Sequence, residues 1–162
     1  MVRLKNRYLI CEMRFKTKQN IVYKITEQDI LCSVKESLVN LYGDYGMGCL
    51  KRSLSVKYLN NYTKVFVIRG KRGPHKMLET AVMDVKEFAA KPLNIQIFHI
   101  GGTIRSCQKV LVKHNRKQLN VLLDKTKKKE EREEIKEMIQ NCSKEGLIKQ
   151  DRHFKGNQEF DT

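Results

Sequence analysis

Two glycines, a threonine and an arginine within the segment GGTIRSCQK, residues 101–109, form the pattern with the clearest chemical use. The alternating residues before this segment predict a strand, and those after it predict an amphipathic helix that begins beside Gly101 and Gly102. Thr103 is placed to cap this helix, and Arg105 stands in its first turn. Because the first N–H groups of a helix are unpaired and its dipole is positive there, the segment is suited to hold a phosphate. It points to nucleic acid as a ligand.

The charge of the whole chain favours the same kind of ligand. Its 162 residues contain 33 Lys and Arg against 18 Asp and Glu, a net charge of +15, which attracts a polyanion from beyond a Debye length. No acidic residue occurs between Asp44 and Glu79, and a second basic run follows the glycine pair at helical spacing, which can track a phosphate backbone. The predicted RNA-binding residues are Arg3, Lys5, Arg7, Lys51, Arg52, Lys57, Arg69, Lys71, Arg72, Gly101, Gly102, Thr103, Arg105, Lys109, Lys113, Arg116 and Lys117.

Apolar periodicity predicts the elements that position these side chains. Strands are expected at 7–15, 54–58, 64–69 and 93–100, and helices at 26–43, at 74–90 and from 103 onward. The series strand, helix, strand, strand, helix, strand is the ferredoxin-like or RRM-like order, an α/β (α+β) two-layer sandwich with a βαββαβ core. Because its first and third strands are central and apolar on both faces, extra C-terminal helices are expected to cover the second face of the sheet. Cys107, Val110, Leu111 and His114 have the spacing for that contact.

The composition changes along the chain and predicts three parts. Residues 1–124 are expected to form the RRM-like domain, 125–142 a charged helix and 143–162 a disordered tail. No secretory signal or membrane span is expected, so the partners include no membrane. The five cysteines are widely spaced and odd in number, which predicts reduced thiols and neither a zinc site nor a disulfide framework.

Other chemistries receive less support from the residues. The third strand, KVFVIRG, offers one aromatic residue, Phe66, where RNA recognition motifs stack bases on a pair, so Phe66 is expected in the core. No hydrolase elbow, Walker loop or metal cluster occurs, and no catalytic or metal-binding residue is predicted. Cys107 is a candidate nucleophile at a helix start, although its position on the apolar stripe of that helix favours a role in core packing. The charge alone is also compatible with an anionic membrane surface, an acidic partner protein or a merely soluble basic surface, although a membrane is not among the predicted partners.

Three separated segments then suggest a family. MVRLKNRYL at 1–9, VKYLNNYT at 56–63 and HIGGTIRSCQK at 99–109 closely resemble the Pop-five protein subunit family of ribonuclease P and ribonuclease MRP. The similarity runs in register from Met1 to about Leu123, whereas the loop from Lys16 to Lys24 and the tail after Lys125 depart from the family pattern.

The resemblance implies an RRM-like sandwich and a non-catalytic, RNA-binding subunit of a ribonucleoprotein. Such a particle removes the 5′ leader from precursor tRNA and, as ribonuclease MRP, processes rRNA. The resemblance further implies that the RNA is the catalyst, with magnesium on the RNA and no cofactor on the protein. The implied partners are ribonuclease P RNA, MRP RNA, precursor tRNA through the holoenzyme and a TIM-barrel-like subunit, in the nucleus and nucleolus. The alternative is a protein-interaction scaffold within the particle, without RNA specificity of its own.

Overall fold

The structure, a computed structural model, describes residues 5–16, 25–88, 91–126 and 129–144. The chain divides into two units, Met1–Ile104 and Arg105–Thr162. In chain order the elements are β1 (Asn6–Phe15), α1 (Glu27–Leu50), β2 (Ser55–Asn60), β3 (Val65–Lys71), α2 (His75–Asp84), β4 (Glu87–Phe88), β5 (Lys91–Gly101), α3 (Ile104–Lys125) and α4 (Lys129–Lys144).

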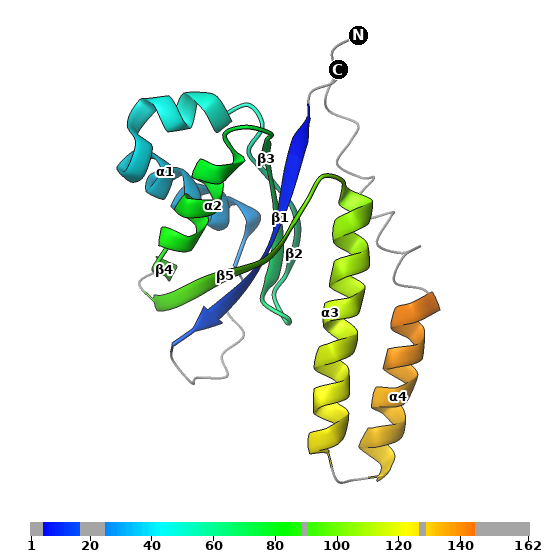
Figure 1. Ribbon diagram of the computed structural model, residues 1–162. Helices are drawn as coiled ribbons and strands as arrows, with labels where there is room; N and C mark the ends of the chain where they lie inside the picture. The colour runs from blue at the N-terminus through cyan, green and yellow to red at the C-terminus, as the bar shows by residue number, and fades with distance from the viewer. Residues whose placement is uncertain (1–4, 17–24, 89–90, 127–128, 145–162) are drawn as a thin grey trace. The chain divides into compact units, whose positions relative to one another are not determined.

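The first unit is an antiparallel sheet with two helices against one face (Figure 1). Its strands lie in the order β2-β3-β1-β5-β4, and every neighbouring pair is antiparallel. Strands β1 and β3 are interior strands, as their apolar residues predict. The predicted α+β class is therefore confirmed. The short strand β4, which pairs with the start of β5, is an element that the periodicity did not predict.

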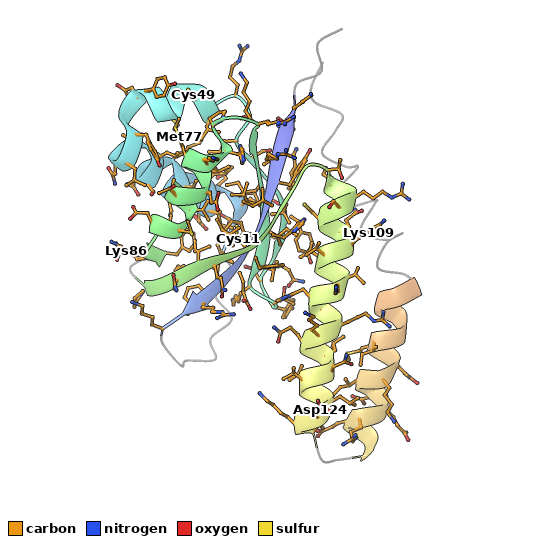
Figure 2. The ribbon with its side chains drawn as sticks, viewed as in Figure 1. Cys11, Cys49, Met77, Lys86, Lys109 and Asp124 are labelled. Carbon is orange, nitrogen blue, oxygen red and sulfur yellow. The ribbon has the colours of Figure 1, made fainter. Side chains whose placement is uncertain are left out.

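The core of this unit lies between the sheet and α1 and α2. Leu9 and Phe66 come from the sheet, and Leu38 and Leu78 come from the helices; all four side chains are fully buried. Cys11 of β1, labelled in Figure 2, is buried with them, and burial raises the pKa of its thiol. The prediction that Phe66 belongs to the core is confirmed, so its ring is not available to stack a base.

Helix α1 begins as predicted and ends later than predicted. The N–H of Thr26 donates to Asp29 Oδ2 at 2.8 Å, and the N–H of Asp29 donates to Thr26 Oγ1 at 3.2 Å, which completes a capping box. At the predicted end, Gly43, the first helical segment does stop, because this residue has a non-helical φ of 60°, but a second segment continues α1 beyond this kink to Leu50. A glycine tolerates that conformation at one position, and the second segment buries Leu50 completely.

Helix α2 ends earlier than its apolar pattern predicts. The helix stops at Asp84, and Val85 is extended at φ −63° and ψ 111°. Ser37 of α1 donates its hydroxyl to the carbonyl of Ala81 at 2.9 Å and to Asp84 Oδ2 at 3.1 Å, which holds the last turn. Phe88 still reaches the core, but it does so from β4. Helix and strand patterns can bury the same side chain, so periodicity alone did not separate them.

Loss of the cap on α1 gives the first testable expectation. Thr26→Ala removes the hydroxyl that accepts from Asp29, and we expect the free energy of unfolding to fall by about 1 kcal/mol. Hydrogen bonds from the Thr26 side chain and backbone lower the pKa of Asp29. Because this folded-state pKa is depressed, the contribution of the carboxylate is present at neutral pH and is lost as the pH falls through that pKa. Urea unfolding at neutral and acidic pH measures both effects.

A matched control for the cap is Thr63→Ala in the turn between β2 and β3. Thr63 is exposed, and its backbone N–H, which the substitution keeps, donates to Asn60 Oδ1. We expect this variant to match the unchanged protein at both pH values. Equal stability of the two threonine variants would contradict the capping assignment.

The second unit contains α3 and α4. Within α3, Cys107 and Leu111 are buried, while Val110 and His114 are half-buried. The charged segment forms α4, on which Met138 is half-exposed. That the C-terminal helices cover the second face of the sheet stays a prediction. The expected disordered tail, 143–162, and the loop 16–24 fall mostly outside the described residues. No helix in the described ranges is apolar enough over a sufficient length to cross a membrane.

Candidate nucleic-acid interface

Residues from three distant parts of the sequence meet at one end of the sheet. Because β1 and β3 are antiparallel, the start of β1 lies beside the end of β3, with Arg7 opposite Gly70 and Tyr8 opposite Arg69. The N–H of Arg72 donates to the carbonyl of Lys5 at 2.8 Å and extends this pairing. We call this surface the basic sheet end; its residues are Lys5, Arg7, Lys51, Arg52, Arg69, Lys71 and Arg72.

Ser53 attaches the loop after α1 to this end of the sheet. The N–H of Lys71 donates to Ser53 Oγ at 3.0 Å, and Arg69 Nε donates to the Ser53 carbonyl at 3.2 Å. These bonds hold the preceding residues, Lys51 and Arg52, beside the end of β3. Nothing in the sequence around Ser53 indicated this role, since it depends on contacts across 16 to 18 positions.

The segments that form the basic sheet end carry cations and no carboxylate. Most of its side chains are exposed, and only Arg7 and Arg69 are half-buried. The segments 5–8, 51–55 and 69–72 contain no Asp or Glu. Two ion pairs of this unit, Arg14–Glu12 at 2.9 Å and Lys86–Asp84 at 4.0 Å, lie elsewhere. The cations therefore sum to a positive surface that attracts phosphate.

Helix α2 adds its own dipole to this charge. It starts directly after Lys71, Arg72 and the loop to Pro74, it has no side-chain hydrogen bond at its N-cap, and its first turn contains no acidic residue. The first turn thus supplies no carboxylate to compensate the positive end of the helix.

The glycine pair meets the basic sheet end through Arg7. Gly101 is the buried last residue of β5, opposite Tyr8, and Gly102 is exposed. A Cβ atom at Gly102 would lie 2.6 Å from Arg7 Nη1. Because Gly102 has no Cβ, it leaves room for the guanidinium group of Arg7. Sequence reasoning singled out both residues without placing them side by side. The helix α3 begins at Ile104, immediately after the exposed Thr103.

A second group of predicted residues lies on α3. All five of its predicted cations are exposed, and they share the helix with the buried Cys107, Gln108 and Leu111. Lys109 is seen on α3 in Figure 2, and Asp124, also labelled, is the one carboxylate of this helix. We call this surface the α3 stripe; its residues are Arg105, Lys109, Lys113, Arg116 and Lys117.

Among the predicted cations, Lys57 and Arg3 belong to neither surface. Lys57 is half-buried in β2, at the irregularity between Val56 and Tyr58 where the pairing with β3 shifts register. Arg3 lies outside the described residues. The candidate nucleophile Cys107 is fully buried, so its thiol is not exposed to a substrate. Within the described ranges, no group of three or more His, Cys, Asp or Glu is arranged to hold a metal ion.

Known proteins are similar to this chain in sequence. Residues 7–112 match the Rpp14/Pop5 family. The ribonuclease P/MRP protein subunit POP5 of Bos taurus is 31% identical over 145 residues, which cover 86% of this chain and 84% of that protein. The corresponding subunit of Danio rerio is 31% identical over 150 residues, or 88% of each chain.

A solved structure shares the fold at low sequence identity. A chain in the cryo-EM structure of yeast ribonuclease MRP has a TM-score of 0.51 and 13% identity, and the likeness covers 75% of this chain and 98% of that chain. At this identity the likeness concerns the fold alone.

Proposed function

The chain belongs to the Rpp14/Pop5 family, and we propose that it is an RNA-binding, non-catalytic protein subunit of ribonuclease P and ribonuclease MRP. In this role it supports the catalytic RNA during removal of the 5′ leader from precursor tRNA and during rRNA processing. The observation that carries the proposal is the basic sheet end, where segments around positions 5, 52 and 70 bring cations together without a carboxylate.

The proposed contacts are made with phosphates and RNA shape. Phe66 is buried in the core, so this sheet lacks the exposed aromatic pair that RNA recognition motifs use for base stacking on the third strand. Lysine and arginine side chains on the basic sheet end and the α3 stripe suit the phosphate backbone, which fixes position and orientation without reading sequence.

The remaining parts of the proposal follow from the family. The catalyst is the RNA with its own magnesium ions, and the protein neutralises phosphates so that the RNA core keeps its folded arrangement. The protein binds no cofactor of its own. Its proposed partners are ribonuclease P RNA, MRP RNA, precursor tRNA through the holoenzyme, and other subunits of the particle, including the TIM-barrel-like one. The proposed location is the nucleus and nucleolus.

The α3 stripe gives a direct test. The double variant Arg105→Ala/Lys109→Ala is expected to bind structured RNA more weakly than the unchanged protein. The slope of log affinity against log salt should fall by about 1.8, because each lost contact to duplex phosphate removes about 0.9. Fluorescence anisotropy across a salt series measures this slope.

A double variant that removes the same charge elsewhere is the control. Lys86→Ala/Lys136→Ala changes two exposed lysines outside both basic surfaces, and its slope is expected to stay close to that of the unchanged protein. An unchanged slope in Arg105→Ala/Lys109→Ala would remove the stripe from the interface. Equal affinity of the unchanged protein for structured RNA and for mixed-sequence duplex would favour the scaffold alternative.

A further inference from the structure

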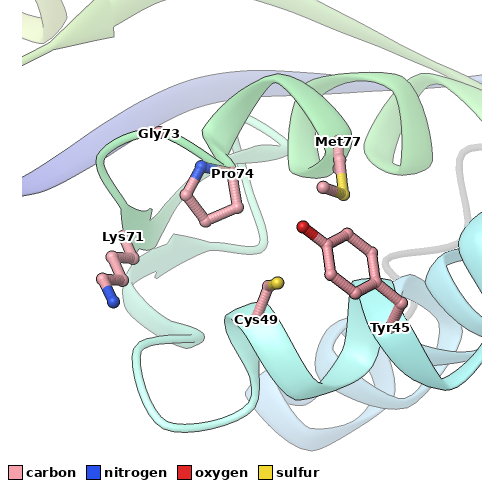
Figure 3. A pocket seen from close by; sticks show the side chains of 6 residues that line it. All are labelled: Tyr45, Cys49, Lys71, Gly73, Pro74 and Met77. Atoms are coloured by element: carbon pink, nitrogen blue, oxygen red, sulfur yellow. The ribbon is translucent and has the colours of Figure 1, made fainter.

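A hollow of about 360 Å³ opens beside the basic sheet end (Figure 3). Its lining comes from the second segment of α1, the end of β3 and the start of α2, so the whole of it belongs to the first unit. We call it the Tyr45 pocket; its lining residues are Tyr45, Cys49, Lys71, Gly73, Pro74 and Met77. Its volume is at the lower end of the range of about 300–1,000 Å³ found for small-molecule sites.

The kink in α1 creates the pocket. Because Gly43 redirects the helix, Tyr45 and Cys49, four positions apart, present one face of the second segment toward α2. Figure 3 shows the sulfur atoms of Cys49 and Met77 directed into the hollow from opposite helices, with the Tyr45 ring beside them. The floor is therefore apolar and polarizable.

The entrance of the pocket is formed by the loop between β3 and α2. Gly73 has φ 105°, and an added Cβ would meet nothing within 4 Å, so the backbone is bare and accessible there. Lys71 stands at the rim and points away from the sulfur atoms (Figure 3). Its backbone is held by the bond from its N–H to Ser53 Oγ. A cation thus stands at the mouth of an apolar hollow.

We propose that the Tyr45 pocket holds a single unpaired nucleobase of an RNA strand, stacked on Tyr45, while the adjoining phosphate contacts Lys71. The inference rests on the proposed RNA-binding function and assigns to it a site that reads unpaired RNA. The Tyr45 side chain is 73% exposed, so its ring is open to contact with a base. Stacking on aromatic side chains is the common way in which proteins bind unpaired bases.

Charge around the pocket favours a nucleotide over an apolar peptide. The segments 44–52 and 71–76 carry five Lys or Arg side chains against one carboxylate, Asp44. Lys71 belongs both to the pocket and to the basic sheet end, so a strand whose phosphates follow that surface passes the entrance. An apolar peptide would contact the floor of the pocket and leave these cations without a partner. A nucleotide contacts the floor with its base and the cations with its phosphate.

The test uses the full chain and a single-stranded RNA of mixed sequence that carries one 2-aminopurine, whose fluorescence falls when it stacks. The unchanged protein is expected to quench the probe. Tyr45→Ala should remove the quenching and weaken binding by about tenfold, since stacking on an aromatic ring changes affinity by a factor of roughly 5 to 150 per base. Its salt slope should not change, because no charge is removed. Tyr45→Phe keeps the ring and should retain both properties.

Tyr62→Ala is the matched control. Tyr62 is 87% exposed in the turn between β2 and β3, at the opposite end of β3 from Lys71, and its removal should change neither quenching nor affinity. If the unchanged protein binds structured RNA but Tyr45→Ala quenches and binds the probe normally, the pocket inference is wrong and the proposed function stands. If Tyr45→Ala instead binds RNA normally but no longer binds protein subunits of the particle, the pocket is a protein-docking site. Absence of all RNA binding would overturn both proposals.

Discussion

The triple variant Arg52→Ala/Lys71→Ala/Arg72→Ala is expected to bind structured RNA on the order of a hundredfold more weakly than the unchanged protein at physiological salt. Three lost phosphate contacts correspond to a slope change of about 2.7 in log affinity against log salt. Extrapolated from 1 M salt, where counterion release contributes little, to about 0.15 M, that slope gives the stated factor.

The expected loss is electrostatic, because these side chains have no role in packing. Arg52, Lys71 and Arg72 are exposed. The bonds that hold the surface together use backbone groups, the N–H of Lys71 to Ser53 Oγ and the N–H of Arg72 to the Lys5 carbonyl. Truncation to alanine leaves these bonds in place, so the fold is preserved while the charge is removed. Arg69 is left unchanged because its guanidinium bonds to the Ser53 carbonyl.

A control variant that lacks the same number of charges elsewhere distinguishes the effect of this surface from the effect of net charge. Lys16, Lys86 and Lys136 are exposed and lie outside the basic sheet end and the α3 stripe. Their triple alanine variant has the same net charge as the first. It should lose only the small part of the affinity that depends on the long-range field of the whole protein. Equal losses in the two triple variants would mean that binding depends on net charge and not on this surface.

The sequence predicted those features that depend on neighbouring residues. A threonine with an aspartate three residues further on predicts the capping box of Thr26 and Asp29, and the apolar residues of the first and third strands predict the burial of Leu9 and Phe66; the structure shows both. The family was also recognised from three short segments that include the glycine pair, and the match over residues 7–112 supports it.

The features that sequence reasoning missed depend on contacts between distant residues. A glycine inside a helical pattern predicts either an end or a kink, and only the burial of Leu50 beyond Gly43 decides in favour of the kink. Phe88 fits a helix face and a strand equally well until β5 is beside it. The contact of Arg7 with Gly102 requires the pairing of β1 with β5. These outcomes are set by tertiary packing, which overrides local preference.

The Tyr45 pocket was missed for a related reason. Tyr45, Cys49 and Met77 show no recognisable motif in the sequence. The apolar spacing before Gly43 predicts a buried stripe of Ile30, Val34, Leu38 and Leu41, but Leu41 is 43% exposed. The kink at Gly43 changes which side of the helix faces α2 after that residue. Because the predicted helix ended at Gly43, no face was assigned to the residues after the kink. The three glycines of GDYGMG, residues 43–48, were the available signal that the regular pattern would fail there.

The second large effect concerns the contact of β3 with α2 next to the basic sheet end. Gly70 is buried between Arg69 and Lys71, and an added Cβ would lie 2.6 Å from Leu78 Cδ2 and 3.5 Å from Leu50 Cδ2. Leu78 is fully buried and cannot move without displacing its neighbours. Gly70→Ala should therefore lower the free energy of unfolding by about 1–3 kcal/mol, a cost of overpacking. Leu78→Ala should lower it by about 2–5 kcal/mol through the cavity that it leaves.

The double variant distinguishes this contact from a general weakness of the strand. In Gly70→Ala/Leu78→Ala the new methyl group occupies part of the space that the leucine vacates. The double variant should then lose less stability than the sum of the single losses, by more than the roughly 0.5 kcal/mol scatter of independent sites. Urea unfolding of the unchanged protein, the two single variants and the double variant provides the double-mutant cycle.

The control is Gly48→Ala. A Cβ at this position of α1 would meet nothing within 4 Å, so the substitution should be neutral or stabilising because alanine favours a helix. Strict additivity at Gly70 and Leu78 would contradict the close contact between the end of β3 and α2.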